Sequence, residues 1–361
     1  MLLARRLIAR TYYITIIITY FIYRKYMTLK IAINGFGRIG RLVLRGILET
    51  KQTDIEVVAI NDLGTNEDNA HLFKYDSVHG RYQGNVSSTG QTLTVDHMHI
   101  SMFQEPAPEK LPWGDLNIDI VFECSGRFTK RDLAAQHLKA GAKHVLISAP
   151  SPDADLTVVY GVNHDKLTTD HKVVSNASCT TNCLAPIADV IHKTVGIDIG
   201  YMTTIHAYTG DQRLVDTQHG DLRRARAAAE SIIPSSTGAA KAVGLVLPEL
   251  KGKLDGTALR VPTANVSAVD FKFLGVKKDF DVNIIHSAIK EASQGRMKGV
   301  LDICDMPLVS KDFNHYPASS VFDLTQTQIL DNRFCRVLSW YDNEWAFSLR
   351  MVDVAKSWFM K

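Results

Sequence analysis

The glycine-rich stretch at residues 35–40 (GFGRIG) constrains the fold most, because of what flanks it. Residues 30–34 predict a short buried strand and residues 41–49 a helix. In such a strand-turn-helix unit Gly35 allows a tight turn, Gly37 lets the backbone approach a pyrophosphate, and Gly40 lets the helix pack on the strand. The helix N-terminus then faces the bound anion.

The glycine motif alone is weak evidence for a nucleotide site, but a second feature supports it. The apolar run at residues 55–60 ends in Asn61-Asp62. A carboxylate in that place accepts hydrogen bonds from the ribose hydroxyls of a dinucleotide. Because its charge would repel a 2′-phosphate, Asp62 favours NAD over NADP. The alternative is a surface loop in which Asp62 only caps a helix.

Further apolar runs predict a doubly wound parallel sheet. Residues 118–123 and 144–147 have the pattern of strands, and residues 130–140 have that of a helix between them. Both strands are followed by small residues, and loops at the carboxyl ends of such strands usually line the ligand crevice. Ser125 and Ser148 are therefore candidate cofactor contacts.

Length and composition limit the class of protein. A chain of 361 residues is expected to form two domains. Its 41 basic and 38 acidic residues are too balanced for a protein that binds nucleic acid through a broad basic face. The five cysteines lack the paired spacing of a metal site or a disulfide framework, so we expect no metal and a reducing, cytoplasmic location.

Residues 1–26 differ from the rest of the chain. The apolar run at residues 11–23 is shorter than the roughly 20 residues that a membrane-spanning helix needs, so no membrane partner is expected. Arg24-Lys25-Tyr26 follows it, where a signal peptide would have small residues. The segment is interpreted as a targeting sequence or, preferably, as an over-extended gene model in which Met27 is the true start.

A candidate nucleophile lies in the segment at residues 176–183 (NASCTTNC). A strand-like run precedes it and a helical pattern follows, so Cys179 is expected at a helix N-terminus, where the helix dipole favours the thiolate. Cys183, one turn later, is expected to be packed inside. His206 ends another strand-like run and could serve Cys179 as a base. Buried structural roles for both residues are the alternative.

Five motifs resemble those of the glyceraldehyde-3-phosphate dehydrogenase family: NGFGRIG, SNASCTTNC, DLRRARAAAESIIPSSTGAAKAVGLVLPELKGKLDG, ALRVPTANVS and SWYDNEW. The resemblance extends from Met27 to the C-terminus. It implies phosphorylating oxidation of D-glyceraldehyde 3-phosphate to 1,3-bisphosphoglycerate with NAD and inorganic phosphate, in glycolysis or gluconeogenesis. It also implies a homotetramer.

The resemblance implies roles for individual residues. Cys179 would attack the aldehyde, and His206 would take the thiol proton and then promote hydride loss, leaving a thioester for phosphate to cleave. The cofactor contacts would add Arg38 and Ile39 at the pyrophosphate and Asn343 at the nicotinamide carboxamide. Small hydroxyls and one planar cation suit the two phosphates. The substrate phosphate would contact Thr209 and Arg260, and the attacking phosphate Ser178, Thr180, Thr237 and Gly238.

The expected fold class is α/β, with a Rossmann doubly wound parallel sheet and an α+β catalytic domain that has a mixed or antiparallel sheet. The expected division is an extension at residues 1–26, an NAD-binding domain at residues 27–178, a catalytic domain at residues 179–342, and a C-terminal helix at residues 343–361 that returns to the first domain.

Two alternatives to this function stay open. One is D-erythrose-4-phosphate dehydrogenase, which shares the SCTTNC motif, although the HAYT run at residues 206–209 resembles the triose-phosphate enzyme more closely. The other is a non-catalytic nucleotide- or RNA-binding relative. Residues 216–219 (DTQH) lack the Leu-Pro of many NAD-specific members, so selectivity for NAD depends mainly on Asp62. The basic cluster at residues 221–226 is expected at a subunit interface.

Overall fold

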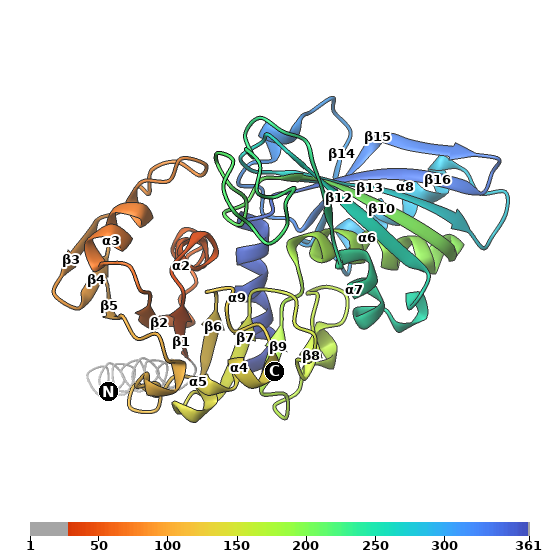
Figure 1. The fold of residues 1–361 in the computed structure, drawn as a ribbon. Helices are drawn as coiled ribbons and strands as arrows, with labels where there is room; N and C mark the ends of the chain where they lie inside the picture. The colour runs from red at the N-terminus through yellow and green to blue at the C-terminus, as the bar shows by residue number, and fades with distance from the viewer. Residues whose placement is uncertain (1–27, 360–361) are drawn as a thin grey trace, which may run out of the picture.

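The computed structural model describes residues 28–359, so the interpretation of residues 1–26 and of Met27 as the start falls outside it. The described chain forms two α/β units, one on a nine-stranded sheet and one on a seven-stranded sheet (Figure 1). The predicted fold class is confirmed. None of the helices within these residues has the length and apolar character that a membrane crossing requires.

The first sheet is parallel except at one edge, where a β-meander joins it. Its central strands are buried on both faces, which explains why their sequences are continuous apolar runs. The strand order across the sheet is β3 (Val86–Thr89), β4 (Thr92–Val95), β5 (Met98–Phe103), β2 (Ile55–Asn61), β1 (Leu29–Asn34), β6 (Ile120–Glu123), β7 (His144–Ile147), β9 (Val173–Ser175) and β8 (Leu156–Thr157).

Helices cover both faces of this sheet. One face holds α2 (Arg38–Glu49) and the last helix, α9 (Trp345–Phe359), whose Met351 and Val352 share a core with Ile31. The other face holds α4 (Arg131–Ala134) and α5 (Gln136–Lys139). A single helix was expected at residues 130–140, but two short helices are found. The helix is interrupted at Ala135, whose carbonyl oxygen accepts a hydrogen bond from the amide of Leu138, only three residues later.

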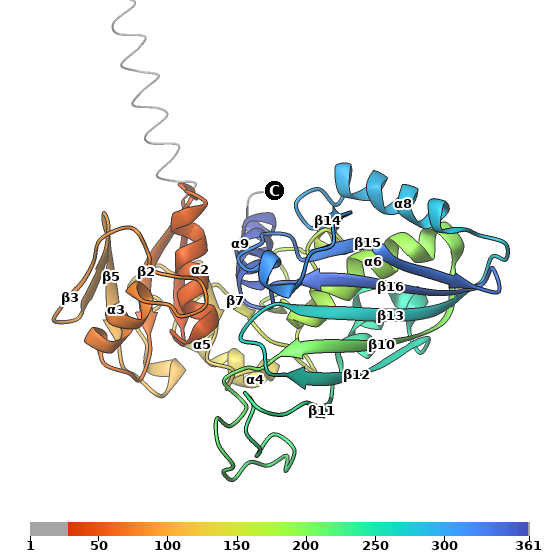
Figure 2. The same ribbon diagram turned by 90° about the horizontal axis from the view of Figure 1, so that it is seen from above.

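The second sheet is mixed, and its helices lie on one face (Figure 2). Phe271 and Phe273 are fully buried between this sheet and the helices α6 (Cys179–Val195), α7 (Ala239–Val246) and α8 (Val282–Gln294). The strand order is β11 (Ile233–Ser236), β12 (Leu254–Val261), β10 (Ile197–Ala207), β13 (Ser267–Gly275), β16 (Phe334–Tyr341), β15 (Ser320–Leu330) and β14 (Leu301–Cys304).

Shorter helical elements connect these layers. Thr65 caps α3 (Asn66–Lys74) by accepting a hydrogen bond from the amide of Asp68. The remaining turns are the 3-10 helices η1 (Pro108–Lys110), η2 (His164–Lys166), η3 (Pro248–Leu250) and η4 (Ser310–Phe313).

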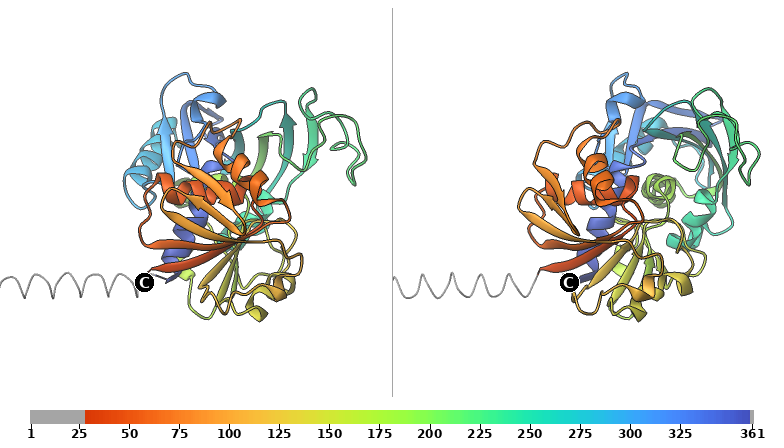
Figure 3. Two further views of the ribbon diagram at one scale, coloured as in Figure 1. Left: turned by 90° about the vertical axis from the view of Figure 1, so that its left-hand side faces the viewer. Right: turned by 60° about the vertical axis from the view of Figure 1, so that its left-hand side comes forward.

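Part of the second unit keeps apolar side chains uncovered. Tyr201 on β10 is 49% exposed. The segment between β10 and β11, green in Figure 3, stands out from the body and carries Leu222, which is 82% exposed. Because large apolar side chains gathered in one region often mark an interface, this surface is a candidate for contact with other subunits.

Candidate active site

A cavity of about 280 Å³ lies where the two units meet. Its walls come from both units, since α2 and the loop after β7 face α6, β10, β12 and the segment before α9. Nine of the residues singled out from the sequence line it: Arg38, Ile39, Ser148, Ser178, Cys179, His206, Thr209, Arg260 and Asn343. Residues far apart in the sequence therefore share one small space.

The local fold places Cys179 at the start of α6, as the sequence predicts. The chain leaves β9 at Ser175 and turns at Ala177, which has a positive φ of 56°. Ser178 then caps the helix, and its hydroxyl accepts a hydrogen bond from the amide of Thr181. The thiol of Cys179 thus lies beside the free amides of a helix N-terminus. Cys183 is fully buried, as expected.

The Cys179 thiol contacts His206, the penultimate residue of β10. Its Sγ lies 3.5 Å from Nε2 of the imidazole. The other ring nitrogen, Nδ1, lies 2.6 Å from the carbonyl oxygen of Ala207 and 3.0 Å from the Arg260 guanidinium. The shorter contact requires a proton on Nδ1, donated to the carbonyl, and the guanidinium then donates to the same carbonyl oxygen, at 3.3 Å. In that tautomer Nε2 carries the lone pair and faces the thiol, as a base requires.

Burial changes the charge state of this pair. Burial and the nearby charge of Arg260 together lower the pKa of His206 to about 3, so the imidazole is neutral. The sequence argument expected a lowered pKa for Cys179, but burial raises the pKa of the thiol. The charge of Arg260 and hydrogen bonds from Thr180 act in the opposite direction. The resting pair is therefore a thiol beside a neutral base.

Arg260 brings a partly buried cation to the same cavity. It lies on β12 directly beside His206 in the parallel pairing of β10 and β12. Within residues 28–359 its Nε is buried without a hydrogen-bond partner, and the guanidinium forms no ion pair with a carboxylate. Burial lowers the pKa of this guanidinium. A desolvated cation without a counter-ion is the arrangement expected of a site for an anionic ligand.

Three residues expected at the attacking phosphate do not line this cavity. The Thr180 hydroxyl faces the buried hydroxyl of Tyr341, at 2.8 Å. Thr237 and Gly238 lie at the start of α7, where Thr237 accepts a hydrogen bond from the amide of Ala239. Only Ser178 of that set lies in the cavity wall.

A second cavity, of about 270 Å³, lies beyond the glycine turn. Gly35 has a φ of +90°, and a Cβ there would lie 2.5 Å from the backbone of Ser125. A Cβ on Gly40 would lie 2.1 Å from the carbonyl oxygen of Gly35, whereas one on Gly37 would meet nothing within 4 Å. Gly35 and Gly40 thus allow close backbone packing, and Gly37 leaves open space at the crevice.

Asp62 is fixed at the edge of this second cavity. One carboxylate oxygen accepts a hydrogen bond from the amide of Phe36 in the glycine turn, at 2.8 Å, and the other from the amide of Gly64, also at 2.8 Å. Ser125 lies in the same wall. The carboxylate therefore borders the cavity beside the glycine turn, and its contact with a ribose stays a prediction.

Arg38 is held by two carboxylates. Its guanidinium pairs with Asp76 and with Glu344, both at 2.6 Å. Because this charge is already matched, we assign the anion-binding capacity here to the free amides in the first turn of α2, at Arg38, Ile39 and Gly40. These groups and the open space at Gly37 fit the pyrophosphate of a dinucleotide.

Several positioning residues escaped the sequence argument. Ser267 donates to the side-chain oxygen of Asn343, at 2.8 Å, which leaves the amide hydrogens of Asn343 for a ligand. The Tyr341 ring packs edge-on against His206. In the first unit, the buried Glu123 accepts hydrogen bonds from both the amide and the hydroxyl of Ser125. Each is the first or last residue of a strand. Ser267 and Tyr341 lie within the ALRVPTANVS and SWYDNEW motifs, but their positioning roles cannot be read from those motifs.

No group of three or more His, Cys, Asp or Glu within the described residues could hold a metal ion. Cys124, Cys304 and Cys335, like the two cysteines of α6, are free thiols. The cavity itself presents a thiol, an imidazole and a guanidinium group.

Two family models match the chain. The model for the NAD binding domain of glyceraldehyde 3-phosphate dehydrogenase matches residues 29–131, and the model for the C-terminal domain matches residues 178–343. The chain is also 62% identical over 329 residues to the glyceraldehyde-3-phosphate dehydrogenase of Xanthobacter flavus, covering 91% of this chain and 98% of the relative. The enzymes of Cereibacter sphaeroides and Geobacillus stearothermophilus are 58% and 56% identical, with the same coverage.

Proposed function

Because this chain belongs to the glyceraldehyde-3-phosphate dehydrogenase family, we propose that the cavity between its two units performs that reaction with Cys179 as nucleophile and His206 as base. The chain is an NAD-dependent oxidoreductase of glycolysis. It converts D-glyceraldehyde 3-phosphate and inorganic phosphate to 1,3-bisphosphoglycerate. The contact of 3.5 Å between thiol and imidazole, beside an unpaired, partly buried guanidinium, carries the assignment of the residues.

The first step is attack of Cys179 on the aldehyde. The thiol proton moves to Nε2 of His206, which the hydrogen bond from Nδ1 to the Ala207 carbonyl keeps as an acceptor. Sγ then forms a bond to the aldehyde carbon, and the carbonyl oxygen gains negative charge. The backbone amide of Cys179, at the helix N-terminus, can donate to that oxygen.

The second step is oxidation of this adduct. A bound NAD would supply the hydride acceptor for this step. The protonated His206 first returns its proton to the oxyanion, which gives the adduct a hydroxyl group. The neutral ring then removes that proton as the hydride leaves the former aldehyde carbon, so that a thioester remains on Cys179. The side-chain amide of Asn343, oriented by Ser267, is proposed to fix the nicotinamide carboxamide in the same cavity. Ser148 lines that cavity as well.

The third step is phosphorolysis of the thioester. Phosphate attacks the acyl carbon, the bond to Sγ breaks, and the acyl phosphate leaves. We assign the phosphate of the substrate to Arg260 and Thr209. We assign the attacking phosphate to Ser178, Thr180, Thr237 and Gly238, although only Ser178 lies in the cavity wall.

The remaining cofactor contacts are proposed along the glycine turn. Asp62 would accept hydrogen bonds from the ribose hydroxyls, and Ser125 lies in the same wall. The backbone of Gly35, Gly37, Arg38, Ile39 and Gly40 would surround the pyrophosphate.

We also propose a cytoplasmic homotetramer in which nucleic acid is not the primary partner. The exposed Tyr201 and Leu222 support burial by neighbouring subunits. Arg224 and Arg226 already pair with Asp211 and Asp216, which leaves little free positive charge for a polyanion. The proposed division is an NAD-binding domain at residues 27–178, a catalytic domain at residues 179–342 and a returning helix at residues 343–361.

Omission of phosphate tests the thioester directly. With aldehyde and NAD but no phosphate, the enzyme should release about one NADH per chain and then stop, because the acyl group stays on Cys179. Mass spectrometry of the trapped protein should find that adduct on Cys179, and Cys179→Ser should give no burst. Sustained NADH formation without phosphate, or an unmodified Cys179, would remove the proposal.

Two further measurements address the alternatives. kcat/KM compared for glyceraldehyde 3-phosphate and erythrose 4-phosphate separates the two dehydrogenases, and equal values would undermine the choice of substrate. A wild-type chain that binds NAD but forms no NADH with either aldehyde would favour the non-catalytic relative.

A further inference from the structure

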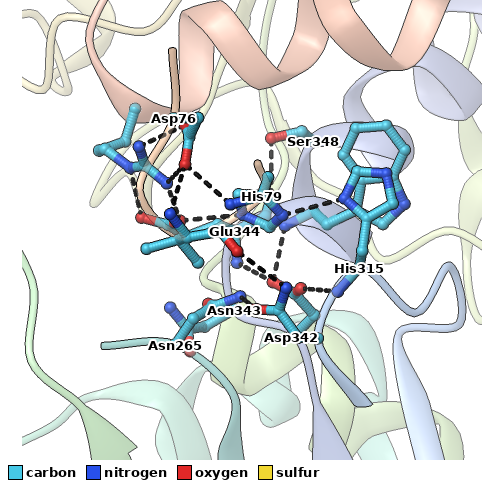
Figure 4. A network of polar contacts seen from close by, with 12 residues as sticks. Asp76, His79, Asn265, His315, Asp342, Asn343, Glu344 and Ser348 are labelled. Carbon is cyan, nitrogen blue, oxygen red and sulfur yellow. Dashed lines mark hydrogen bonds and ion pairs between the residues drawn. The ribbon is translucent and has the colours of Figure 1, made fainter. Parts of the chain in front are cut away.

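Two histidines from different units meet beside the cofactor crevice (Figure 4). His79 follows α3 in the first unit, and its side chain is fully buried. His315 follows η4 in the second unit. Their Nδ1 atoms lie 3.0 Å apart, which is a hydrogen-bond distance and therefore requires a proton on one of the two nitrogens.

The outer nitrogens of the pair each face a carboxylate. Nε2 of His79 lies 3.1 Å from Glu344, and Nε2 of His315 lies 2.9 Å from Glu49. Burial opposes ionisation of Glu49, but hydrogen bonds from His315 and Arg45 hold its pKa below the usual value. Burial likewise opposes ionisation of Glu344, and hydrogen bonds from Arg38 and His79 hold its pKa low. Both carboxylates are therefore pure acceptors.

These contacts fix the number of protons on the two rings. Each Nε2 must carry a proton to donate to its carboxylate, and the contact between the Nδ1 atoms needs one more. Three ring protons on two imidazoles give the pair one positive charge. A neutral pair has only two, so either the Nδ1 lone pairs would face each other or one Nε2 lone pair would face a carboxylate.

The surrounding charges favour a cation. Four carboxylates and two guanidinium groups from the packed segments touch the pair or its direct partners, and the charge of Arg41 on α2 also acts on Asp76 and Glu344. The neighbourhood is still negative without the extra proton. The carboxylates are Glu49, Asp76, Asp342 and Glu344, and the contacting guanidinium groups are Arg38 and Arg45.

The pair lies next to a proposed cofactor contact. His315 stacks on Trp345, the first residue of α9, with ring centroids 3.7 Å apart. Glu344 precedes Trp345, lines the catalytic cavity and also binds Arg38. Asn343, the next residue toward the N-terminus, lines the same cavity. Contacts of the pair therefore join α2 to the segment that carries Asn343.

We propose that His79 and His315 share one excess proton, and that this cationic pair is a positioning device that holds Glu344, and with it Asn343 and Arg38, in the geometry that binds NAD. The inference rests on the proposed contact of Asn343 with the cofactor. The conformation that binds NAD is the one in which the pair carries the extra proton. By thermodynamic linkage, NAD affinity must therefore fall as the pH rises and the pair loses that proton.

The first test is the pH dependence of NAD affinity in His315→Phe. Phenylalanine keeps the stacking on Trp345 but removes both hydrogen bonds of His315. We expect the Kd of the wild type to rise about tenfold between about pH 6 and about pH 9. The variant should bind NAD weakly at every pH, with a flat profile. Parallel profiles for the two proteins would overturn the proposal.

A matched control distinguishes loss of the histidine pair from loss of a histidine elsewhere in the chain. His286 on α8 is another partly buried histidine, and its partner is Thr327 in the second unit, outside both cavities. His286→Phe should keep the wild-type pH profile. A profile as flat as that of His315→Phe would mean that the effect is not specific to the pair.

Glu49→Gln tests the charge alone. Its amide oxygen can still accept from His315, but the anion that retains the proton is gone. NAD affinity should therefore fall at lower pH than in the wild type, while unfolding stability at acidic pH stays similar. An unchanged profile would contradict the proposed proton.

The ring protons can also be counted directly. Neutron diffraction of the wild-type protein should place three exchangeable hydrogens on the two rings at neutral pH, and two would refute the proposal. Cys179→Ser distinguishes this inference from the proposed function, because it should abolish turnover and keep the pH profile of NAD binding. If the thioester were disproved, that profile would still decide the role of the pair.

Discussion

The two ends of the cofactor crevice are built in different ways. At the glycine turn, the wall comes from the ends of four strands of the first sheet and the loops that follow them, and both oxygens of Asp62 already accept amide hydrogens. At the catalytic end, Cys179, His206 and Arg260 come from three elements. There, within the described part of the chain, the buried Nε of Arg260 has no partner.

This difference separates binding from reactivity. At the glycine turn, the backbone amides that would bind the cofactor are already in place before any ligand arrives. Changes there should therefore alter NAD affinity or folding. The catalytic end keeps a cation unmatched and a base unprotonated, so changes there should alter turnover and leave NAD affinity nearly unchanged. Substitutions at five positions test this separation, from the largest expected effect to the smallest.

His206→Gln should lower kcat by about 10² to 10⁴-fold, because glutamine cannot accept the thiol proton. The Kd for NAD should not change, since the Nδ1 side of the ring contacts only Ala207 and Arg260. Steady-state NADH formation and calorimetry measure the two quantities. A variant with normal kcat would show that another group is the base.

Arg260→Met should lower kcat/KM for the aldehyde by about 10²-fold, because the substrate phosphate loses its partly buried cation. The charge of Arg260 lowers the pKa of both Cys179 and His206. Its removal should therefore raise both values and move the alkaline-rising limb of the rate profile to higher pH. Arg260→Lys should restore part of the rate. An unshifted profile would argue against this electrostatic coupling.

Gly40→Ala and Gly37→Ala form a matched pair at the glycine turn. The Gly40 variant should lose about 3 kcal/mol of unfolding free energy, because its Cβ would overlap the Gly35 carbonyl oxygen. The Gly37 variant should keep its stability but bind NAD about tenfold more weakly, because its Cβ points into open space at the crevice. Urea unfolding measures the stability of the two variants, and NAD titration measures their affinity. A less stable Gly37 variant and a more weakly binding Gly40 variant would contradict these roles.

Asp62→Asn should have the smallest effect. Asparagine offers one acceptor oxygen, so either Phe36 or Gly64 loses a hydrogen bond, and the ribose loses a charged acceptor. NAD affinity should fall about fivefold, and discrimination against NADP should weaken. Binding of both cofactors to both proteins measures this. Unchanged discrimination would mean that selectivity does not depend on Asp62.

The sequence predicted features that depend on neighbouring residues. The strand, glycine turn and helix at β1 and α2 follow from local pattern, and Cys179 begins α6 as expected. The helix expected at residues 130–140 is split at Ala135. The sequence did not predict this split, because the periodicity of apolar residues cannot detect a local change in hydrogen-bond spacing. The pairing of His79 with His315 was missed, since no motif connects two segments so far apart.

By itself, the sequence determined the fold class, the nucleotide turn and the residue types available for thioester chemistry, because apolar periodicity, glycine spacing and helix starts act over a few residues. Only the tertiary structure decided the charge states of Cys179 and His206, the unmatched charge of Arg260 and the separation of Thr180 from the cavity wall. Desolvation and hydrogen bonding set these properties, and both depend on which distant segments come to surround a group.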